Sequence, residues 1–169
     1  MTQYDIDVLT PERVDWIDRE FAAGFYAKRA GYFSACLAAQ LRGELVLLLA
    51  RDDEALLGYL KVVWEPDYPP FRAQGIPEVQ DLNVVTSERR RGVASRLMDR
   101  AEHLIATRNP VAGIGVGLHP GYGAAQRMYV LRGYVPDALP ITYHDEPVTE
   151  YQAVILDDDL VLHLTKQLR

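Results

Sequence analysis

Cysteine is nearly absent from this 169-residue chain, because Cys36 is the only one and no disulfide can form within it. Its surroundings, "SACLAAQL", predict a small buried thiol on a helix. Long apolar runs are absent as well, since the longest aliphatic stretch, "LVLLLA" at residues 45–50, is far shorter than the ~20 residues that cross a bilayer. The first residues, "MTQYDIDVLTPERVDW", lack the apolar core of a secretory signal. We therefore expect a cytoplasmic protein without a membrane partner.

Basic residues are outnumbered, with 18 Lys and Arg against 24 Asp and Glu and a net charge of −6. This balance argues against a nucleic acid as the main partner, because phosphate binding requires a basic surface. It favours cationic small molecules instead. The sequence also lacks repeats, low-complexity tracts and Gly/Ser linkers, and its length suits one core. We expect a single domain over residues 1–169.

The spacing of apolar residues predicts alternating strands and helices in the order β-α-α-β-β-β-α-β-α-β-β. Strands are expected at residues 4–9, 45–51, 56–64, 79–85, 111–118 and 159–168, and helices after Pro11 and at 31–41, 93–105 and 120–132. The turn "DDEA" joins two strands as a hairpin. The segment 65–77 holds four prolines, and we expect an irregular loop over a site.

The connections between these elements predict the fold class. The early strands are linked by short turns, which favour antiparallel pairing, whereas the strand–helix–strand unit at 79–118 favours a parallel pair with a right-handed crossover. We expect an α/β fold with a mixed, mostly antiparallel sheet of about seven strands and helices on both faces.

The strand "VAGIGVGL" at residues 111–118 has all three of its glycines, 113, 115 and 117, on one face. Glycine weakens a strand and often marks a place where a ligand or another backbone comes close. The alternative is a face packed tightly against another element of the same protein. Both interpretations stay open at the level of sequence.

The stretch "VVTSERRRGVAS", residues 84–95, places three arginines and a glycine between a strand and a helix. The amides at a helix N-terminus lack partners and favour an anion. Gly92 would let a bulky anion approach the backbone, and Arg89, Arg90 and Arg91 could neutralise its charge. Neither the mononucleotide loop Gly-x-x-x-x-Gly-Lys-Ser/Thr nor the dinucleotide motif Gly-x-Gly-x-x-Gly occurs here. The segment is a candidate pyrophosphate cradle, and the alternative is a solvated basic loop.

Two motifs in order carry a resemblance to a known family. Arg89, Gly92 and Ala94 match Arg/Gln-x-x-Gly-x-Gly/Ala, the cofactor motif of the GNAT superfamily of acetyl-CoA-dependent N-acyltransferases. Downstream, "YGAAQRMYVLRGYVPD" resembles that superfamily's helix Asn-x-x-Ala-x-x-Leu/Met-Tyr followed by Gly-Phe/Tyr, with Ala125, Met128, Tyr129, Gly133 and Tyr134 as the matches. Tyr122 stands where the family has asparagine, so a side-chain contact from that position is in doubt. The resemblance covers about residues 45–135.

The resemblance implies a splayed central strand pair that receives the pantetheine of acetyl-CoA. Val84 and Val85 would then pair with the pantetheine, and the amides of Arg91, Gly92, Val93, Ala94 and Ser95 would hold the pyrophosphate. Acyl transfer to an amine requires loss of the amine's proton, stabilisation of an oxyanion and protonation of the departing thiolate. A backbone N–H near Val84 is the expected oxyanion donor.

The resemblance also implies two catalytic residues. Tyr129, at the superfamily's tyrosine position, is the candidate that protonates the thiolate, and the alternative is a core aromatic residue. Glu78, at the position of the glutamate in the histone-acetyltransferase branch, is the candidate base, and the alternative is a solvated carboxylate at a strand end. Strand parity places Asp81 and Asn83 on the opposite face from Glu78 unless a bulge intervenes. A water chain could replace a single base.

The four histidines, His103, His119, His144 and His163, have no metal-ligand spacing, so no metal is implied. The acceptor cleft is expected among the two N-terminal helices, the proline-rich segment and residues 136–159. These carry the aromatic residues Tyr26, Tyr32, Phe33, Tyr68, Phe71, Tyr143 and Tyr151 and the acids Glu65, Asp67, Asp145, Glu146 and Glu150. Such a lining suits a small cationic amine.

Three functions compete at this stage. The first is an N-acetyltransferase that transfers the acetyl group of acetyl-CoA to a primary amine of a small molecule or peptide, by direct attack in a ternary complex. The second is a non-catalytic acyl-CoA sensor on the same fold. The third is a nucleic-acid-binding module that uses the arginine run, against which the net charge counts. Self-association as a homodimer, through exposed C-terminal strands, is a further expectation.

Overall fold

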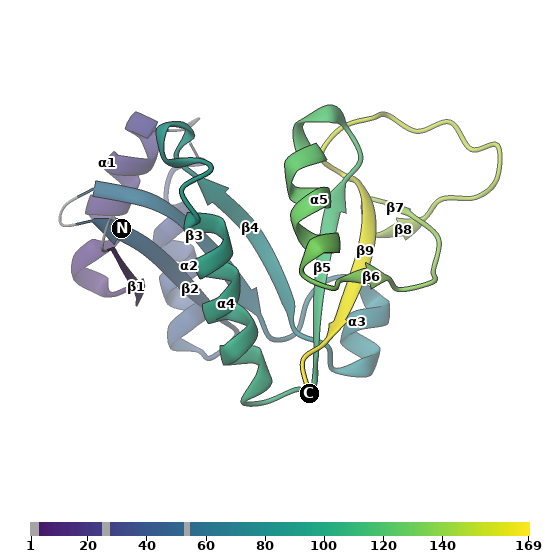
Figure 1. Cartoon of the computed structure of the whole chain (residues 1–169), viewed down its shortest axis with the longest axis horizontal. Coiled ribbons are helices and arrows are strands. Elements are labelled where there is room, and N and C mark those ends of the chain that lie inside the picture. The colour runs from purple at the N-terminus through teal and green to yellow at the C-terminus, as the bar shows by residue number, and fades with distance from the viewer. Residues whose placement is uncertain (1–3, 25–27, 53–54) are drawn as a thin grey trace. The chain divides into compact units, whose positions relative to one another are not determined.

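A computed structural model of the chain describes residues 4–24, 28–52 and 55–169. The chain divides into two compact units (Figure 1). One comprises residues 1–64 and 79–104, and the other comprises residues 65–78 and 105–169. Each unit is described separately below.

The first unit is a four-stranded segment of sheet with helices on both faces. Its strands follow the order β1 (Asp5–Val8), β2 (Leu45–Asp52), β3 (Ala55–Val63) and β4 (Glu78–Val84), and β1–β2 and β2–β3 are antiparallel. The first residue of β4, Glu78, belongs to the second unit. Helices α1 (Val14–Gly24) and α2 (Tyr32–Leu41) lie on one face and α4 (Val93–Ala106) on the other (Figure 1). The 3₁₀ turns η1 (Pro11–Arg13) and η2 (Thr86–Glu88) precede α1 and α4. The core forms where Phe21 and Phe33 pack edge-on against Tyr59.

The second unit is built around the antiparallel pair β5 (Val111–Gly117) and β9 (Leu160–Gln167). Three two-residue strands extend it: β6 (Val135–Pro136), β7 (Thr142–Tyr143) and β8 (Glu146–Pro147). The 3₁₀ turn η3 (Pro120–Tyr122) leads into α5 (Gly123–Leu131), and α3 (Pro69–Gln74) precedes β4. The start of β4 runs beside β5, where Gly113 N donates to the carbonyl of Pro77 over 2.8 Å.

Most elements expected from the sequence are confirmed within one or two residues, but the segment 65–77 is not. We expected an irregular loop, whereas Pro69–Gln74 form helix α3. The prediction was wrong because Pro69 and Pro70 occupy the first helical turn, where proline loses no hydrogen bond. Gly75, with φ 64°, then ends the helix. Residues 53 and 54 of the expected "DDEA" turn lie outside the described residues.

The glycines of β5 are covered by side chains of the same unit. A Cβ built on Gly113 would lie 2.4 Å from the ring of Phe71, and one on Gly117 would lie 2.4 Å from the ring of Tyr122. The packing interpretation of this face therefore holds at both positions, since rings of the chain occupy the space. Tyr122, which stands where the family has asparagine, packs its ring over Gly117.

Asp81 lies within β4, and its φ of 56° is left-handed. A non-glycine residue adopts this conformation only where its surroundings hold it. The surroundings are a group that we call the Asp81 cluster, formed by Lys28, Tyr32, Tyr59, Asp81 and Asn83. The left-handed residue is a local irregularity of β4, a departure from regular strand geometry for which the parity argument left room.

The carboxylate of Asp81 accepts hydrogen bonds from every other member of this cluster. Tyr59 Oη donates to Oδ2 over 2.6 Å and Asn83 Nδ2 to Oδ1 over 2.8 Å, while the Tyr32 hydroxyl donates to Oδ2. Lys28 Nζ lies 3.0 Å from Oδ1 and forms an ion pair. Although burial opposes it, this set of donors lowers the pKa of the Asp81 carboxyl below its ordinary value. The same burial, with the nearby carboxylate, raises the pKa values of Tyr32 and Tyr59.

Gly58 allows β3 to approach β4 closely at Asn83. A Cβ built at this position would lie 2.5 Å from the carbonyl oxygen of Asn83, which is backbone and cannot rotate away. The strand pairing continues beyond it, where Val85 N donates to the carbonyl of Leu57 over 2.9 Å. Gly58 and the Asp81 cluster together fix the course of β4. The turn that carries Arg89, Arg90 and Arg91, which we call the arginine turn, follows it.

A helix that crosses a bilayer needs about 20 mostly apolar residues. Among the residues that the structure describes, every helix is too short or too polar to cross a bilayer.

We predict that Gly58→Ala lowers the free energy of unfolding by about 2–3 kcal/mol, because the new methyl group must push two paired strands apart. Gly123→Ala is the matched control, since a Cβ there has no atom of the described residues within 4 Å and the position is helical. That control should be neutral or stabilising by about 0.5–1 kcal/mol. Urea denaturation of both variants measures the difference, and equal midpoints would contradict the close approach of β3 and β4.

We predict that Asp81→Asn destabilises the protein by about 2–4 kcal/mol at pH 7, because it leaves Lys28 and two phenols without their carboxylate. Asparagine tolerates the left-handed backbone, so the loss reports the charge. The folded-state pKa of Asp81 lies below its ordinary value of 3.8, so its contribution to stability exists above pH 3.8 and disappears as the pH falls through the folded-state pKa.

Denaturation of the natural chain and the Asp81→Asn variant at pH 7 and pH 3 tests this dependence. The difference between the two free energies of unfolding should shrink at the lower pH. A difference of the same size at both pH values would show that the Asp81 charge does not hold the cluster together.

Candidate active site

The arginine turn connects β4 to α4 in the first unit. Two of its residues are left-handed, Arg90 with φ 61° and Gly92 with φ 85°. The turn opens directly into α4, where Arg96 N donates to the carbonyl of Gly92 over 3.0 Å. The amides of Val93 and Ala94 precede this first helical hydrogen bond, so helix geometry directs them out of the helix end. The local structure has the backbone features that an anion cradle requires, and the binding of an anion there stays a prediction.

The surroundings of Gly92 fit a bulky anion. A Cβ built on Gly92 has no atom of the described residues within 4 Å, so the space beside this backbone is open. The positive φ favours glycine, because other residues are strained there. A pyrophosphate needs amides, open space and positive charge in one place. The residues present fit such a group.

The three arginines are exposed and differ in their contacts. Arg91 forms an ion pair with Glu88, and Arg89 Nε lies 3.4 Å from the carbonyl oxygen of Val84. Glu88 therefore compensates part of the positive charge of the turn. Backbone amides are left as the main source of attraction for an anion, with the guanidinium groups at the sides.

The backbone of Val84 and Val85 faces two different edges of β4. Val85 N is committed to the carbonyl of Leu57 in β3. Adjacent residues of a strand present their amides to opposite edges, so the amide of Val84 faces away from β3. Of the two residues expected to pair with pantetheine, Val84 has the amide that a ligand could use.

Glu78 lies in the second unit, at the first position of β4, and is only 6% exposed. The alternative of a solvated strand-end carboxylate is therefore wrong, because neighbouring side chains cover it. A Cβ built on Gly115 would lie 3.3 Å from Glu78 Oε1, 2.9 Å from Val161 Cγ1 and 3.5 Å from His163 Cδ2. Gly115 thus makes room for a buried carboxylate.

An aromatic wall, formed by Tyr68, Phe71 and His163, lies in the same unit. The rings of Tyr68 and His163 are stacked, with centroids 3.5 Å apart and planes at 2°. Phe71 meets both rings edge-on. All three residues are at most 3% exposed. Burial lowers the pKa of His163 to about 4, so its imidazole is neutral at ordinary pH.

Tyr129 belongs to α5 in the second unit and is 5% exposed. Its ring lies 6.0 Å from that of Tyr134, and its carbonyl accepts the amide of Tyr134 where Gly133 turns the chain with φ 88°. Burial raises the pKa of the Tyr129 phenol, which keeps the hydroxyl protonated. A protonated phenol can donate a hydrogen bond to a sulfur or oxygen.

The acids expected around the acceptor are partly brought together. Partial burial raises the pKa of Asp145, and the charges of Asp67, Asp159 and Glu146 raise it further. These carboxylates belong to the second unit and repel one another, so a cation would relieve them. Glu65 and Glu150 are exposed.

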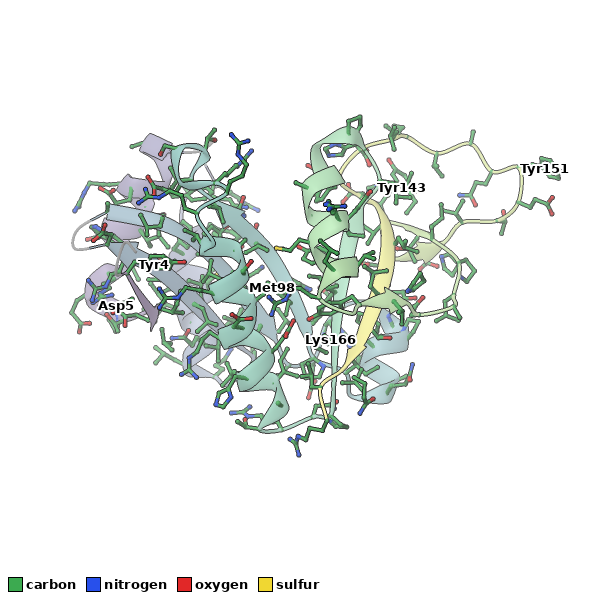
Figure 2. All side chains as sticks on the ribbon, viewed as in Figure 1. Tyr4, Asp5, Met98, Tyr143, Tyr151 and Lys166 are labelled. Atoms are coloured by element: carbon green, nitrogen blue, oxygen red, sulfur yellow. The ribbon has the colours of Figure 1, made fainter. Side chains whose placement is uncertain are left out.

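The aromatic residues expected around the acceptor are scattered. Tyr151 is 97% exposed and stands at the outer end of the segment between β8 and β9 (Figure 2). Phe33 is fully buried in the core of the first unit, so it does not line a cleft. Tyr143 donates to Asp157 over 3.2 Å. Tyr26 lies outside the described residues.

The remaining histidines form local contacts. His119 Nε2 lies 2.8 Å from Asp158 Oδ1 and its Nδ1 accepts the amide of Gly121, which fixes the turn before α5. Among the described residues, no group of three His, Cys, Asp or Glu side chains could hold a metal ion. Cys36 is buried in α2, as its sequence context predicts.

The expected site residues fall into two groups. The cofactor-binding candidates, residues 84–95, lie in the first unit, and Glu78 and Tyr129 lie in the second. The sequence did not predict that His163 packs beside Gly115, or that Lys28 and Tyr59 are partners of Asp81. No local pattern marks them, because strand pairing and helix packing bring them together.

Comparisons with known proteins agree with this fold. The family model "Acetyltransferase (GNAT) family" matches residues 10–134. An N-acetyltransferase from Staphylococcus aureus Mu50 is similar in structure, with a TM-score of 0.71 and 14% identity over 99% of this chain and 100% of that one. No curated protein sequence matches the chain.

Two further structures contain the cofactor. The yncA protein of Salmonella typhimurium, solved with its cofactor acetyl-CoA, has a TM-score of 0.65 and 14% identity over 98% of this chain and 94% of that one. An aminoglycoside 6'-N-acetyltransferase complexed with coenzyme A has a TM-score of 0.66 and 14% identity over 98% and 97% of the two chains.

The fold is the α/β fold of these structures, with a mixed, mostly antiparallel sheet and a parallel pair at the start of β4 and β5. The expected splay of that pair, and the expected single domain over residues 1–169, stay predictions. The family model covers well over half of the chain, from before α1 to just after α5. The chain therefore belongs to the acetyltransferase (GNAT) family of acetyl-CoA-dependent N-acetyltransferases.

Proposed function

We propose that this protein transfers the acetyl group of acetyl-CoA to a primary amine of a small molecule or peptide, by direct attack in a ternary complex. The observation that carries the proposal is the arginine turn. It presents helix amides, a left-handed glycine and open space at the end of β4. This is the chemistry that the pyrophosphate of coenzyme A requires.

The first unit supplies the grip on the cofactor. The amides of residues 91–95 receive the pyrophosphate, with Gly92 allowing its close approach, and Arg89, Arg90 and Arg91 offset its charge from the sides. The backbone of Val84 pairs with the pantetheine, since the amide of Val85 is already bonded to β3. When bound, acetyl-CoA supplies an activated acetyl group as a thioester.

Glu78 is the base that takes the proton of the amine. Its carboxylate is buried at the start of β4, over the bare backbone of Gly115. Asp81 is the other carboxylate on β4. Its oxygens accept hydrogen bonds from two phenols, an amide and an ammonium group. The lowered pKa of Asp81 makes it a poor base.

Tyr129 protonates the departing thiolate. Its phenol stays protonated because burial raises its pKa, so a donor is present throughout the working pH range. Its place on α5, shortly before the Gly133 turn, supports this role, because the sequence there resembles the tyrosine motif of the superfamily. The oxygen that gains charge during the attack is met by a backbone N–H near Val84.

The acceptor is a cationic amine in this proposal. The charge balance of −6 and the mutually repelling carboxylates of Asp67, Asp145 and Asp159 support a positively charged partner. The ammonium group would relieve this repulsion on binding and then lose a proton to become nucleophilic.

We predict that the protein binds coenzyme A and that Gly92→Asp abolishes binding. The new carboxylate would crowd and repel the pyrophosphate at a position where glycine is favoured. Arg90→Ala should weaken binding only about 3–10-fold, because it removes one exposed charge. Isothermal calorimetry with coenzyme A measures both. An equal loss in the two variants would contradict a grip made chiefly by backbone amides.

We predict that the protein releases free thiol from acetyl-CoA in the presence of a primary amine, and that Tyr129→Phe lowers kcat by about 10²–10⁴-fold. The loss should fall on kcat more than on the affinity for coenzyme A, since the phenol acts on the departing sulfur. A thiol assay over a panel of mono-, di- and polyamines and peptides measures turnover, and calorimetry measures the affinity.

Two outcomes would contradict parts of the proposal. Cofactor binding without turnover of any amine would indicate an acyl-CoA sensor in place of an enzyme. Normal turnover by Tyr129→Phe would remove the phenol from the mechanism. Absence of coenzyme A binding, combined with salt-dependent affinity for DNA or RNA, would favour the nucleic-acid-binding alternative.

A further inference from the structure

The aromatic wall of Tyr68, Phe71 and His163 has no part in the mechanism above, although it borders the proposed base. His163 is opposite Gly115 in the antiparallel pair of β5 and β9. The residue is 3% exposed, and its Nδ1 is buried without a hydrogen-bonding partner among the described residues. A buried, polar and neutral side chain at this position needs a reason, since an apolar residue would pack there at no cost in lost hydrogen bonds.

The space over Gly115 joins the ring to the carboxylate. A Cβ on Gly115 would contact Glu78 Oε1 at 3.3 Å and His163 Cδ2 at 3.5 Å, so both groups approach the same bare backbone position. The third contact, Val161 Cγ1 at 2.9 Å, closes the remaining side. Glu78, His163 and Val161 therefore share the space over the backbone of Gly115.

The orientation of the His163 ring is fixed by a closed set of contacts. Tyr68 stacks on it at 3.5 Å, and the Tyr68 hydroxyl donates to Asp137 Oδ2 over 2.8 Å. Asp137 N in turn donates to the carbonyl of His163 over 3.1 Å. Phe71 packs edge-on at 5.5 Å. The ring therefore cannot swing away without losing its stack on Tyr68, and the two hydrogen bonds hold Tyr68, Asp137 and the His163 backbone together.

We propose that His163 is a positioning residue for Glu78, whose carboxylate it holds over Gly115 and shields from water. The proposal rests on the role of Glu78 as the base in the proposed function. A fixed carboxylate acts more effectively as a base than a mobile one, and exclusion of water increases its affinity for a proton.

The neutrality of the imidazole is part of this role. Burial keeps the pKa of His163 near 4, although the charge of Asp137 opposes this. A neutral ring excludes water without forming an ion pair, which would hold Glu78 in its ionised form. The other titratable groups around Tyr68 are Asp137 and Asp145, which act on Tyr68 together with Glu78. They are unchanged in the variants below.

The test compares His163→Ala with His163→Phe in the full chain. Phenylalanine keeps a flat ring for the Tyr68 stack and has no titratable nitrogen, so it should retain kcat within about 3-fold. Alanine admits water to Glu78, which favours the ionised carboxylate. The acidic limb of the pH profile of kcat/KM should then move to lower pH by about half a unit or more, and kcat should fall about 10-fold. One acceptor amine is used throughout, so its own titration cancels.

A second measurement requires no turnover. The ¹³C carboxyl resonance of Glu78, assigned by its loss in Glu78→Gln, is titrated in the free protein. The midpoint should lie lower in His163→Ala than in the natural chain and should be unchanged in His163→Phe. If His163→Ala does not fold, His163→Thr takes its place, because a β-branched residue suits the strand and still removes the ring.

The results separate this proposal from the proposed function. Identical Glu78 midpoints in the natural chain and His163→Ala would overturn the positioning role, as would a His163→Phe variant as impaired as His163→Ala. Unchanged kcat in Glu78→Gln would overturn the assignment of the base, while the titration still decides whether the ring acts on the carboxylate.

Discussion

The buried carboxylate of Asp81 is the interaction on which the course of β4 depends. It holds a left-handed residue in the middle of a strand, and it does so by accepting hydrogen bonds from two phenols, an amide and the ammonium group of Lys28. These donors come from β3, β4, the first residue of α2 and the segment that leads into α2. Since β4 ends at Val84 and the arginine turn follows shortly after it, this cluster positions the start of the proposed cofactor site.

The second unit depends on a different constraint, which is close packing over glycine. The bare face of β5 receives rings of Phe71 and Tyr122 and, between them, the carboxylate of Glu78. A sequence of alternating glycines is thereby converted into a face that fits three large side chains. The cost in strand propensity is offset by the burial of two aromatic residues.

The two carboxylates of β4 illustrate how environment divides roles between similar groups. Asp81 is surrounded by donors, which stabilise its charge and make it structural. Glu78 is buried over the bare backbone of Gly115, a position that His163 approaches as well. Pairs of titratable groups whose surroundings differ in this way are typical of acid–base catalysis. Three residues along one strand therefore separate a structural anchor from the proposed base.

The sequence by itself determined the elements and the cofactor. Periodicity and turn residues predict the six longer strands and four of the five helices, because these signals are local. The arginine turn and the motif around Tyr129 point to the family, because each motif lies within a short stretch of sequence. An anion cradle, for example, needs a glycine and amides within a few residues. The exception among the helices, α3, begins with two prolines that count against a helix anywhere but at its first turn.

Only the tertiary structure decided what surrounds the reacting groups. The burial of Glu78 depends on Gly115 and His163, which lie 37 and 85 residues further along the chain. The partners of Asp81 include Lys28, 53 residues away. The left-handed break at Asp81 has no local signature either, because aspartate is compatible with many conformations. Charge environment is a property of side chains from distant segments, so packing determined which carboxylate is an anchor and which is shielded from water.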